Sequence, residues 1–240
     1  GGGAMAFRDL KNTTKDIDLI VTSGDDLQQL QIVLLANGYE VVKDPGEEYD
    51  ELGAQRILEN DDGCRIDVFN KQVIDKLVLS DGMRQRSERY LDAGELSVEL
   101  VSAEDIFLFK AVAGRTDDIE DMFGLIQTAL DFDVIEDELS QQIDLLGQEL
   151  FVSYVNEALF DLEEQHNITT PLAETVSEIT ERVYRELEVL QAIDDSISRS
   201  ELAETLDLSA TELEEALRSL KGKDVITVDD QQITKESTAL

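Results

Sequence analysis

Cysteine, histidine, proline and tryptophan are nearly absent from this sequence, and what is missing narrows the possible kinds of protein. Cys64 is the single cysteine, so an intrachain disulfide and a cysteine-based zinc site are both excluded. His166 is the single histidine, and its acidic surroundings predict a solvated surface residue rather than a metal ligand. No apolar run approaches the roughly 20 residues of a membrane span, and no secretory leader is evident. These absences predict a soluble cytoplasmic protein that has no membrane partner.

Basic residues are also scarce, with 20 Lys and Arg against 55 Asp and Glu, and the formal net charge is −35. So much like charge destabilises a compact state in dilute buffer, whereas at about 1 M salt the screening length falls to about 3 Å and the repulsion fades. One acidic interaction tail is the alternative explanation, but such tails are contiguous blocks, and here the acids run from Asp9 to Glu236. The composition resembles that of proteins from salt-loving archaea, so we expect a protein that works in a halophilic cytoplasm.

The 240 residues are enough for one sizeable domain and a smaller one, and the sequence pattern changes twice along the chain. Residues 1–127 alternate strand-length apolar runs with helical patterns. The runs lie at 17–21, 54–58 and 66–69, and the helical patterns at 25–37 and 103–114. Asn37-Gly38 ends the first helical pattern in the manner of a C-cap. This region therefore predicts an α+β core built on a small mixed sheet.

Residues 128–181 predict a helical segment with an acidic, solvated face. From 116 to 181 the sequence has no Lys or Arg, yet apolar residues recur at helical spacing. We expect the buried stripe of two or three amphipathic helices to consist of Leu125, Leu130, Ile135, Leu139, Ile143, Leu146, Leu150, Val155, Leu159 and Leu162. A hinge is expected at 167–171, with Pro171 opening the next helix.

Residues 182–240 form a third region with helical patterns at 183–193, 200–206 and 210–220, followed by short strand patterns at 225–228 and 232–234. This order of helices, turn and hairpin resembles the winged helix-turn-helix, which makes DNA binding one interpretation. However, three of the five outward positions on the third helix are the acids Glu212, Glu214 and Glu215, and phosphate contacts need Lys or Arg. We therefore expect this module to pack against protein, either the segment 131–165 or a second copy in a homodimer, rather than to read DNA sequence.

The candidate chemistry lies at the start of the sequence, where Gly1-Gly2-Gly3-Ala4 is followed by Asp16-Ile17-Asp18. On a strand, Asp16 and Asp18 project from one face while Ile17 projects from the other. Two neighbouring carboxylates repel each other unless a cation lies between them, and oxygen ligands favour a hard ion, Mg²⁺ or Mn²⁺. The glycines allow the backbone to approach a phosphate closely, and a helix starting at Ala4 would direct free N–H groups at it.

Further charged residues extend this pattern. Arg8, Lys11 and Lys15 add positive charge beside the glycines. Asp67 lies within the apolar run 66–69, and its side chain is expected on the opposite face of the strand from its apolar neighbours. A site for two metal ions requires a third acid of this kind. A metal ion beside bound phosphate is the arrangement used in nucleotide chemistry.

The order Gly-Gly, then Asp-x-Asp, then a lone Asp on a strand resembles the minimal nucleotidyltransferases of the DNA polymerase beta superfamily. The likeness covers about the first half of the chain and is strongest to the toxin-type branch of abortive-infection and toxin–antitoxin systems. The residues that match that branch in register are Gly1, Gly2, Ala4, Arg8, Thr14, Asp16 and Asp18. A later signature of the branch is matched by Lys110, Arg115, Asp118 and Asp121, whereas Asp117 stands where the family has a lysine. The family also has a strand ahead of the Gly-Gly turn, and the printed sequence starts at that turn.

The resemblance implies a role for each matching residue. Asp16 and Asp18 would hold Mg²⁺ on an NTP, and Asp67 would hold a second metal ion or act as the base. The turn at Gly1 and Gly2 would bind phosphates, and Lys110 would reach the triphosphate. The other positions implied to contact the nucleotide are Arg8, Thr14, Arg115 and Asp118. An alternative for Lys110, Arg115 and Asp118 is an ion-pair network on a helix surface, because charge pairs at this spacing are common.

Three hypotheses for the function follow. The first is a transferase that moves a nucleoside monophosphate from an NTP to an acceptor hydroxyl on RNA, protein or a small molecule, with an antitoxin as a further partner. The second is a winged-helix DNA-binding regulator whose front half senses a nucleotide. The third is a degenerate transferase that serves as a binding partner, against which the retention of Asp16, Asp18 and Asp67 argues.

Overall fold

The chain is an α+β protein, as predicted, and contains two compact units, Gly1–Glu174 and Thr175–Leu240. This description rests on a computed structural model, which describes residues 1–14, 16–42, 54–73, 76–94, 96–229 and 232–236. The sequence pattern changes near residues 127 and 181, whereas the boundary between the compact units lies at 174. Most of the acidic helical segment therefore lies in the first unit together with the mixed-sheet region.

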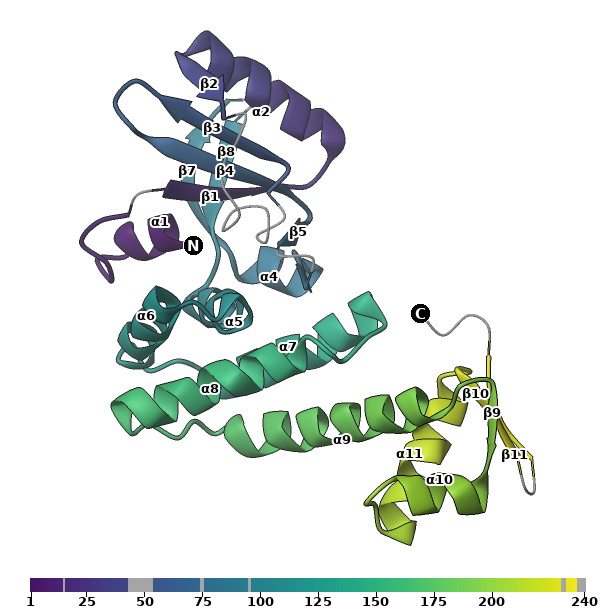
Figure 1. The fold of residues 1–240 in the computed structure, drawn as a ribbon. Coiled ribbons are helices and arrows are strands. Elements are labelled where there is room, and N and C mark those ends of the chain that lie inside the picture. Colours follow the sequence, from purple (N-terminus) through teal and green to yellow (C-terminus); the bar gives the residue numbers. More distant parts are fainter. Residues whose placement is uncertain (15, 43–53, 74–75, 95, 230–231, 237–240) are drawn as a thin grey trace. The chain divides into compact units, whose positions relative to one another are not determined.

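The first unit is built on a four-stranded sheet in the order β1-β4-β3-β2 (Figure 1). Strands β1 (Asp16–Val21) and β4 (Arg65–Asn70) are parallel, while β3 (Arg56–Asn60) is antiparallel to β4 and to β2 (Tyr39–Val41). The three strand-length runs of the sequence are thus all strands, displaced by one or two residues from their expected bounds. The parallel pair β1–β4 lies at one side of the sheet and carries the three candidate acids.

One face of this sheet is apolar and is covered by α2 (Gly24–Ala36) (Figure 1). The core on this face contains Ile17 and Leu19 from β1, and Ile66 and Val68 from β4. Helix α2 begins where the Ser23 hydroxyl accepts a hydrogen bond from the Asp26 N–H, 3.1 Å away. It ends at Asn37 and Gly38, whose φ of 85° is the left-handed conformation of the expected C-cap. With its apolar side chains in this core, β1 presents its acids on the opposite face.

The segments around this sheet differ most from the expectations. The first helix, α1, spans Gly2–Ala6, so it starts before Ala4 and has only five residues. Strands β5 (Gln72–Val73), β6 (Leu77–Val78), β7 (Glu88–Ala93) and β8 (Leu96–Leu100) and helix α4 (Asp81–Arg86) were not predicted from the sequence. Two-residue strands are too short for a period to show, and β7 has no regular apolar alternation. Strand β8 does alternate apolar and polar residues, and the prediction missed it.

Four helices complete the first unit: α5 (Ala103–Ala113), α6 (Thr116–Ile126), α7 (Phe132–Leu146) and α8 (Val152–His166). Helices α7 and α8 pack on α5, and α8 also packs on α6. The predicted apolar stripe is mostly buried. The prediction is wrong for Leu150, which is 41% exposed, and it missed Gln142, which is fully buried in the core face of α7.

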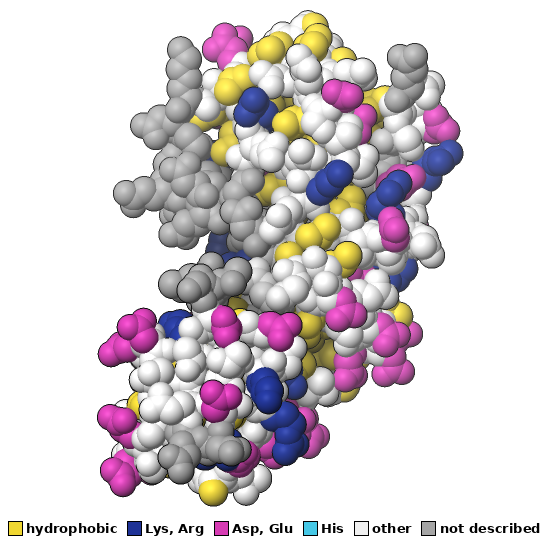
Figure 2. All heavy atoms as spheres, turned by 90° about the vertical axis from the view of Figure 1, so that its right-hand side faces the viewer, with side chains coloured by type: hydrophobic (Ala, Val, Ile, Leu, Met, Phe, Trp, Pro, Cys, Tyr) yellow, Lys and Arg dark blue, Asp and Glu magenta, His cyan; other side chains and the backbone are white. Residues whose placement is uncertain are grey.

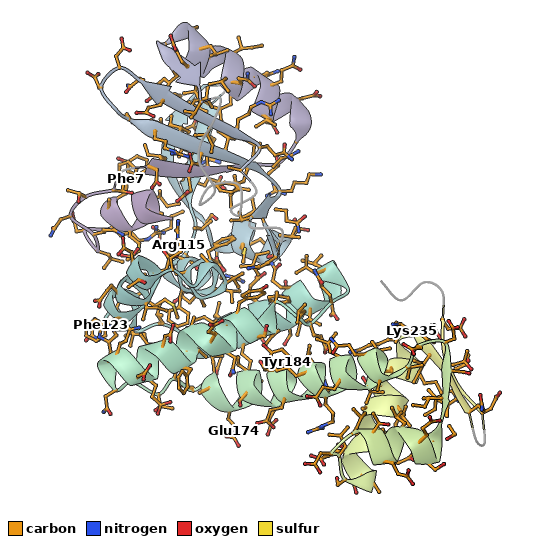
Figure 3. The ribbon with its side chains drawn as sticks, in the orientation of Figure 1. Phe7, Arg115, Phe123, Glu174, Tyr184 and Lys235 are labelled. Atoms are coloured by element: carbon orange, nitrogen blue, oxygen red, sulfur yellow. The ribbon has the colours of Figure 1, made fainter. Side chains whose placement is uncertain are left out.

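His166 also corrects an expectation. Its ring stacks on Phe123, with 4.2 Å between ring centroids and an interplanar angle of 8°, and its Nε2 lies 3.4 Å from Glu120 (Figure 3). The side chain is 15% exposed, so it is a packed residue and not a solvated one. The apolar area that the ring covers on Phe123 outweighs the polar character of the surrounding segment.

The second unit contains α10 (Arg199–Thr205), α11 (Ala210–Gly222) and a three-stranded sheet in the order β10-β11-β9. Its strands are β9 (Ser196–Ser198), β10 (Ile226–Val228) and β11 (Gln232–Lys235), of which β9 was not expected. Helix α9 (Ala173–Ala192) starts close to Pro171, where a helix was expected to open, and it continues without a break into the pattern expected at 183–193. It crosses the boundary between the units. Ser209 begins α11 through a capping box with Glu212.

Two further properties complete the description. None of the helices in the described part of the chain combines the length and apolarity that crossing a membrane requires. On the face drawn in Figure 2, Asp and Glu side chains are scattered over the surface rather than gathered in one block.

Candidate active site

The register of β1 against β4 places charged residues side by side. Asp16 is paired with Arg65, and Asp18 is paired with Asp67. Neighbouring strands are about 4.8 Å apart, and paired residues of parallel strands project from the same face. Two strand steps therefore bring three carboxylates and one guanidinium onto one face of the sheet, opposite the apolar core. We call these four residues, Asp16, Asp18, Arg65 and Asp67, the carboxylate quartet.

Asp67 is the most buried member of the quartet, with 1% of its surface exposed. Its Oδ1 accepts a hydrogen bond from Arg65 Nε at 2.8 Å, while its Oδ2 is buried without a hydrogen-bond partner in the described structure. Burial raises the pKa of Asp67 above its ordinary value, and Asp18 and Asp16 raise it further, although Arg65 opposes them. A buried carboxylate oxygen without a partner, next to two more acids, is where an added positive charge would be stabilising.

The glycine turn lies directly against the quartet. A Cβ placed on Gly1 would come within 1.6 Å of Asp18 Oδ2, and one on Gly2 within 2.6 Å of Thr14 Oγ1. A side chain at either position would therefore displace an acid or the threonine. The Thr14 hydroxyl donates to the backbone oxygen of Asp16 at 2.8 Å, which fixes the chain just before β1. The missing side chains let the backbone lie close to the Asp18 carboxylate at Gly1 and close to the Thr14 hydroxyl at Gly2.

A second group of charges, formed mainly by α5 and α6, lies close to this turn. Lys110 on α5 is 6% exposed, and its Nζ donates to Asp118 Oδ1 at 2.6 Å and lies 2.8 Å from Asp121 Oδ2. Arg115, labelled in Figure 3, precedes α6 and donates from Nε to Asp118 Oδ2 at 2.7 Å. Lys11, from the loop between α1 and β1, donates to both oxygens of Asp121. We call these five residues the lysine–aspartate cluster.

The electrostatic effects within the cluster support the charged forms of Lys110, Asp118 and Arg115. Burial alone would lower the pKa of Lys110, but Asp118 and Asp121 outweigh it, so the pKa is raised. Burial would raise the pKa of Asp118, but Arg115 and Lys110 reverse this and lower it. The carboxylates of Asp18 and Asp16 also contribute to the raised pKa of Arg115, although the effects of burial, which opposes the shift, and of Asp118 are larger. The cluster and the quartet therefore interact electrostatically.

Arg8 has a different position from the other predicted nucleotide-binding residues. Its guanidinium donates to the backbone oxygens of Ala4 and Leu100, both at 3.4 Å, and lies 3.8 Å from Glu88. These contacts join α1 to the hairpin formed by β7 and β8. The other predicted positions, Gly1, Gly2, Thr14, Lys110, Arg115 and Asp118, belong to the turn, to its supports or to the cluster.

The donor set fits a hard divalent cation in its chemistry, since the quartet offers carboxylate oxygens of which one is buried and unpartnered. Within the ranges that the structure describes, no group of three or more Asp, Glu, His or Cys side chains is arranged so that it could hold a metal ion. One reason lies in Asp67, whose Oδ1 is turned to Arg65. Metal binding by the quartet is therefore a proposal.

The sequence predicted the three acids and most of the cluster as candidates, but it did not predict two of the contacts between side chains. Arg65 stands two residues before Asp67 on the same strand, so the alternation of β4 already places both on one face. The contact between Lys11 and Asp121 joins residues 110 positions apart, and no local pattern indicates it.

Comparison with known proteins adds no assignment: a scan against protein-family models matches none of them, and a search of curated proteins finds no matching relative.

Proposed function

We propose that the chain is a Mg²⁺-dependent nucleotidyltransferase that moves a nucleoside monophosphate from an NTP to a hydroxyl of an acceptor. The observation that carries this proposal is the β1–β4 register, which sets Asp18 beside the buried Asp67 with the backbone of Gly1 against Asp18. Acids on one sheet face next to a glycine turn supply metal ligands and a phosphate site together. The resemblance of the same residues to the minimal nucleotidyltransferases supports this reading.

Each group of residues has a part in the proposed transfer. Asp16 and Asp18 would hold the ion, which when bound neutralises charge on the triphosphate and orients the α-phosphate. Asp67 would hold a second ion or act as the base. The glycine turn gives the phosphates room beside the backbone, and the lysine–aspartate cluster supplies positive charge next to that turn.

The proton of the acceptor hydroxyl needs a base. Where Asp67 acts as the base, its unpartnered Oδ2 would take that proton, and the raised pKa of the carboxyl favours the proton-bound form. The acceptor oxygen then forms a bond to the α-phosphorus, the bond from that phosphorus to the bridging oxygen breaks, and pyrophosphate leaves. RNA, protein and small molecules remain possible acceptors.

The direct test measures nucleotide binding and pyrophosphate release. Titration with ATP, GTP, CTP and UTP in molar KCl with Mg²⁺ identifies the NTP, and a pyrophosphate assay with candidate acceptors follows.

Asp16→Asn and Asp18→Asn should each abolish transfer, with losses of about a hundredfold or more, because each removes a charge that acts in the transition state. Ile17→Ala is the matched control from the same strand: it should cost about 2–5 kcal/mol of stability and spare the chemistry of molecules that remain folded. Full activity of Asp16→Asn would refute the assignment.

The second candidate function is a DNA-binding regulator, for which the arrangement of α10, α11 and the β9–β10–β11 sheet gives some support because it is winged-helix-like. Two of its basic residues, however, are paired with acids of the same unit. Arg199 pairs with Glu214, and Lys223 donates to Glu186 at 2.6 Å. We therefore place this function second.

A further inference from the structure

Lys11 is the one member of the lysine–aspartate cluster that comes from the N-terminal loop. Its Nζ donates to Asp121 Oδ1 at 2.9 Å and to Oδ2 at 2.8 Å. The same Oδ2 also lies 2.8 Å from Lys110 Nζ. Asp121 thus holds two ammonium groups next to each other, one from α5 and one from the loop that connects the glycine turn to β1.

The two lysines differ in their access to solvent. The side chain of Lys110 is 8% exposed, and its ammonium group is held by both Asp118 and Asp121. The side chain of Lys11 is 30% exposed. An ammonium group has three N–H donors, and in the described structure Asp121 accounts for two of those on Lys11. The third donor can bind a ligand without any loss of the pair with Asp121.

The side chain of Lys11 also passes over the glycine turn. A Cβ placed on Gly2 would lie 4.0 Å from Lys11 Cδ, and the nearest atom to such a Cβ belongs to Thr14. The ammonium group is therefore held next to the segment proposed to receive phosphates. Within the lysine–aspartate cluster the three cations exceed the two carboxylates, and the carboxylates of Asp16 and Asp18 act on Arg115 rather than on Lys11.

We propose that Lys11 is a phosphate-binding residue that donates to the β- or γ-phosphate of the NTP, and that Asp121 is its positioning residue. This role rests on the proposed function and assigns to one residue the recognition of the triphosphate. Lysine binds phosphate as a compact charge with several donors, which suits a group of oxygens whose orientation is not fixed. An ion pair that only joins the loop to α6 would affect stability but would not distinguish nucleotides by their number of phosphates.

The test is isothermal titration of the full chain with three ligands. They are the NTP that the wild type binds most tightly and the di- and monophosphate of the same nucleoside. Lys11→Met keeps the length of the side chain and removes the charge. Loss of a charge-assisted hydrogen bond should weaken triphosphate binding about tenfold or more, while monophosphate binding should change by less than about twofold. Lys11→Arg should keep most of the triphosphate affinity. Lys221→Met, at an exposed lysine of α11, is the control for a general effect of charge.

The outcomes separate this inference from the proposed function. If the wild type binds none of the four NTPs, the proposed function is refuted, and the role of Lys11 with it. Two results would refute only the role of Lys11, given that the wild type binds an NTP. Either Lys11→Met binds that NTP as tightly as the wild type does, or its affinities for the triphosphate and the monophosphate fall by the same factor.

A second measurement needs no variant. Acetylation of the wild type by an amine-reactive reagent, followed by mass spectrometry, should show Lys11 protected when the NTP is present and Lys221 unchanged. Equal labelling of Lys11 with and without bound NTP would contradict the proposal.

Discussion

At the residue scale, the environment of Asp67 opposes the charge that the proposed chemistry requires. Burial raises the pKa of Asp67, and Asp18 and Asp16 add to that effect. A carboxyl with a higher pKa in the folded state binds its proton more tightly there than in the unfolded chain. Stability is therefore unaffected below the unfolded pKa of about 3.9, falls as the pH rises through the folded pKa, and stays reduced at neutral pH. Asp67 thus acts against the fold under the conditions in which its charge would be used.

Asp67→Asn should therefore stabilise the chain at neutral pH while abolishing transfer. The amide oxygen can still accept from Arg65, and the amide N–H group can donate to the neighbouring Asp18. We expect a gain of about 1 kcal/mol, or about 2–4 °C in Tm for a unit of this size, that disappears at pH values below about 3.9. Thermal unfolding at several pH values measures this. Asp61→Asn, at an exposed position, is the control and should change the stability by less than about 0.5 kcal/mol. A variant that is less stable than the wild type at pH 7 would contradict the argument.

At the scale of elements, one guanidinium joins three helices of the first unit. Arg86 on α4 donates to Asp105 on α5 at 2.6 Å and to Glu138 on α7 at 2.5 Å. Both acids have side chains that are 1% exposed. Gln142 continues the network, because it donates to Glu138 at 2.8 Å and exchanges hydrogen bonds with the backbone of Val78 on β6. The pKa of Asp105 is raised by burial, with Arg86 opposing the shift, so its ionised form depends on that partner.

Arg86→Met should destabilise the first unit by about 3–5 kcal/mol, because two carboxylates would stay buried without a cation. Arg84→Met is the matched control on the same helix. Arg84 is 56% exposed and pairs only with Asp81 at 3.6 Å among the described contacts, so its loss should stay within about 0.5 kcal/mol. Urea unfolding of both variants measures the difference, and the loss in Arg86→Met should shrink at low pH as the acids gain protons. Equal losses in the two variants would refute the network's role.

The same elements show how far the sequence predicts the structure. The alternation Asp16-Ile17-Asp18 predicts which side chains face the core, and the core contact of Ile17 confirms it. Asp105 and Glu138 could not be predicted as buried, since their partner lies 19 and 52 positions away and each acid reads as part of a solvated helix face. Local patterns predict facing and spacing, whereas contacts between distant segments depend on the assembled fold.

The second unit offers a test at the same scale of the DNA-binding alternative. Glu214 and Glu215 are exposed on α11, while Glu212 is half-buried and lies 3.6 Å from Arg185. An acidic helix surface repels phosphate, so we expect no sequence-selective binding in gel-shift experiments with the operator region of its own gene over a range of KCl concentrations. The double variant Glu214→Lys, Glu215→Lys should bind DNA weakly and without sequence selectivity, and this binding should disappear with added salt. Tight and selective binding by the wild type in molar KCl would make the regulator the leading function.

At the scale of the whole molecule, a net charge of −35 distributed along the chain predicts that salt stabilises the fold. The screening length falls from about 30 Å at 0.01 M salt to about 3 Å at 1 M, so repulsion among surface carboxylates should fade and Tm should rise with KCl. Salts also stabilise proteins by exclusion from the surface, and a charge variant separates the two causes. Replacing the exposed acids Asp144, Glu164 and Glu204 by Asn or Gln should raise Tm in dilute buffer and reduce the gain from KCl. The same gain in the wild type and the variant would assign the effect to exclusion, and a Tm that stays flat or falls with KCl would contradict adaptation to high salt.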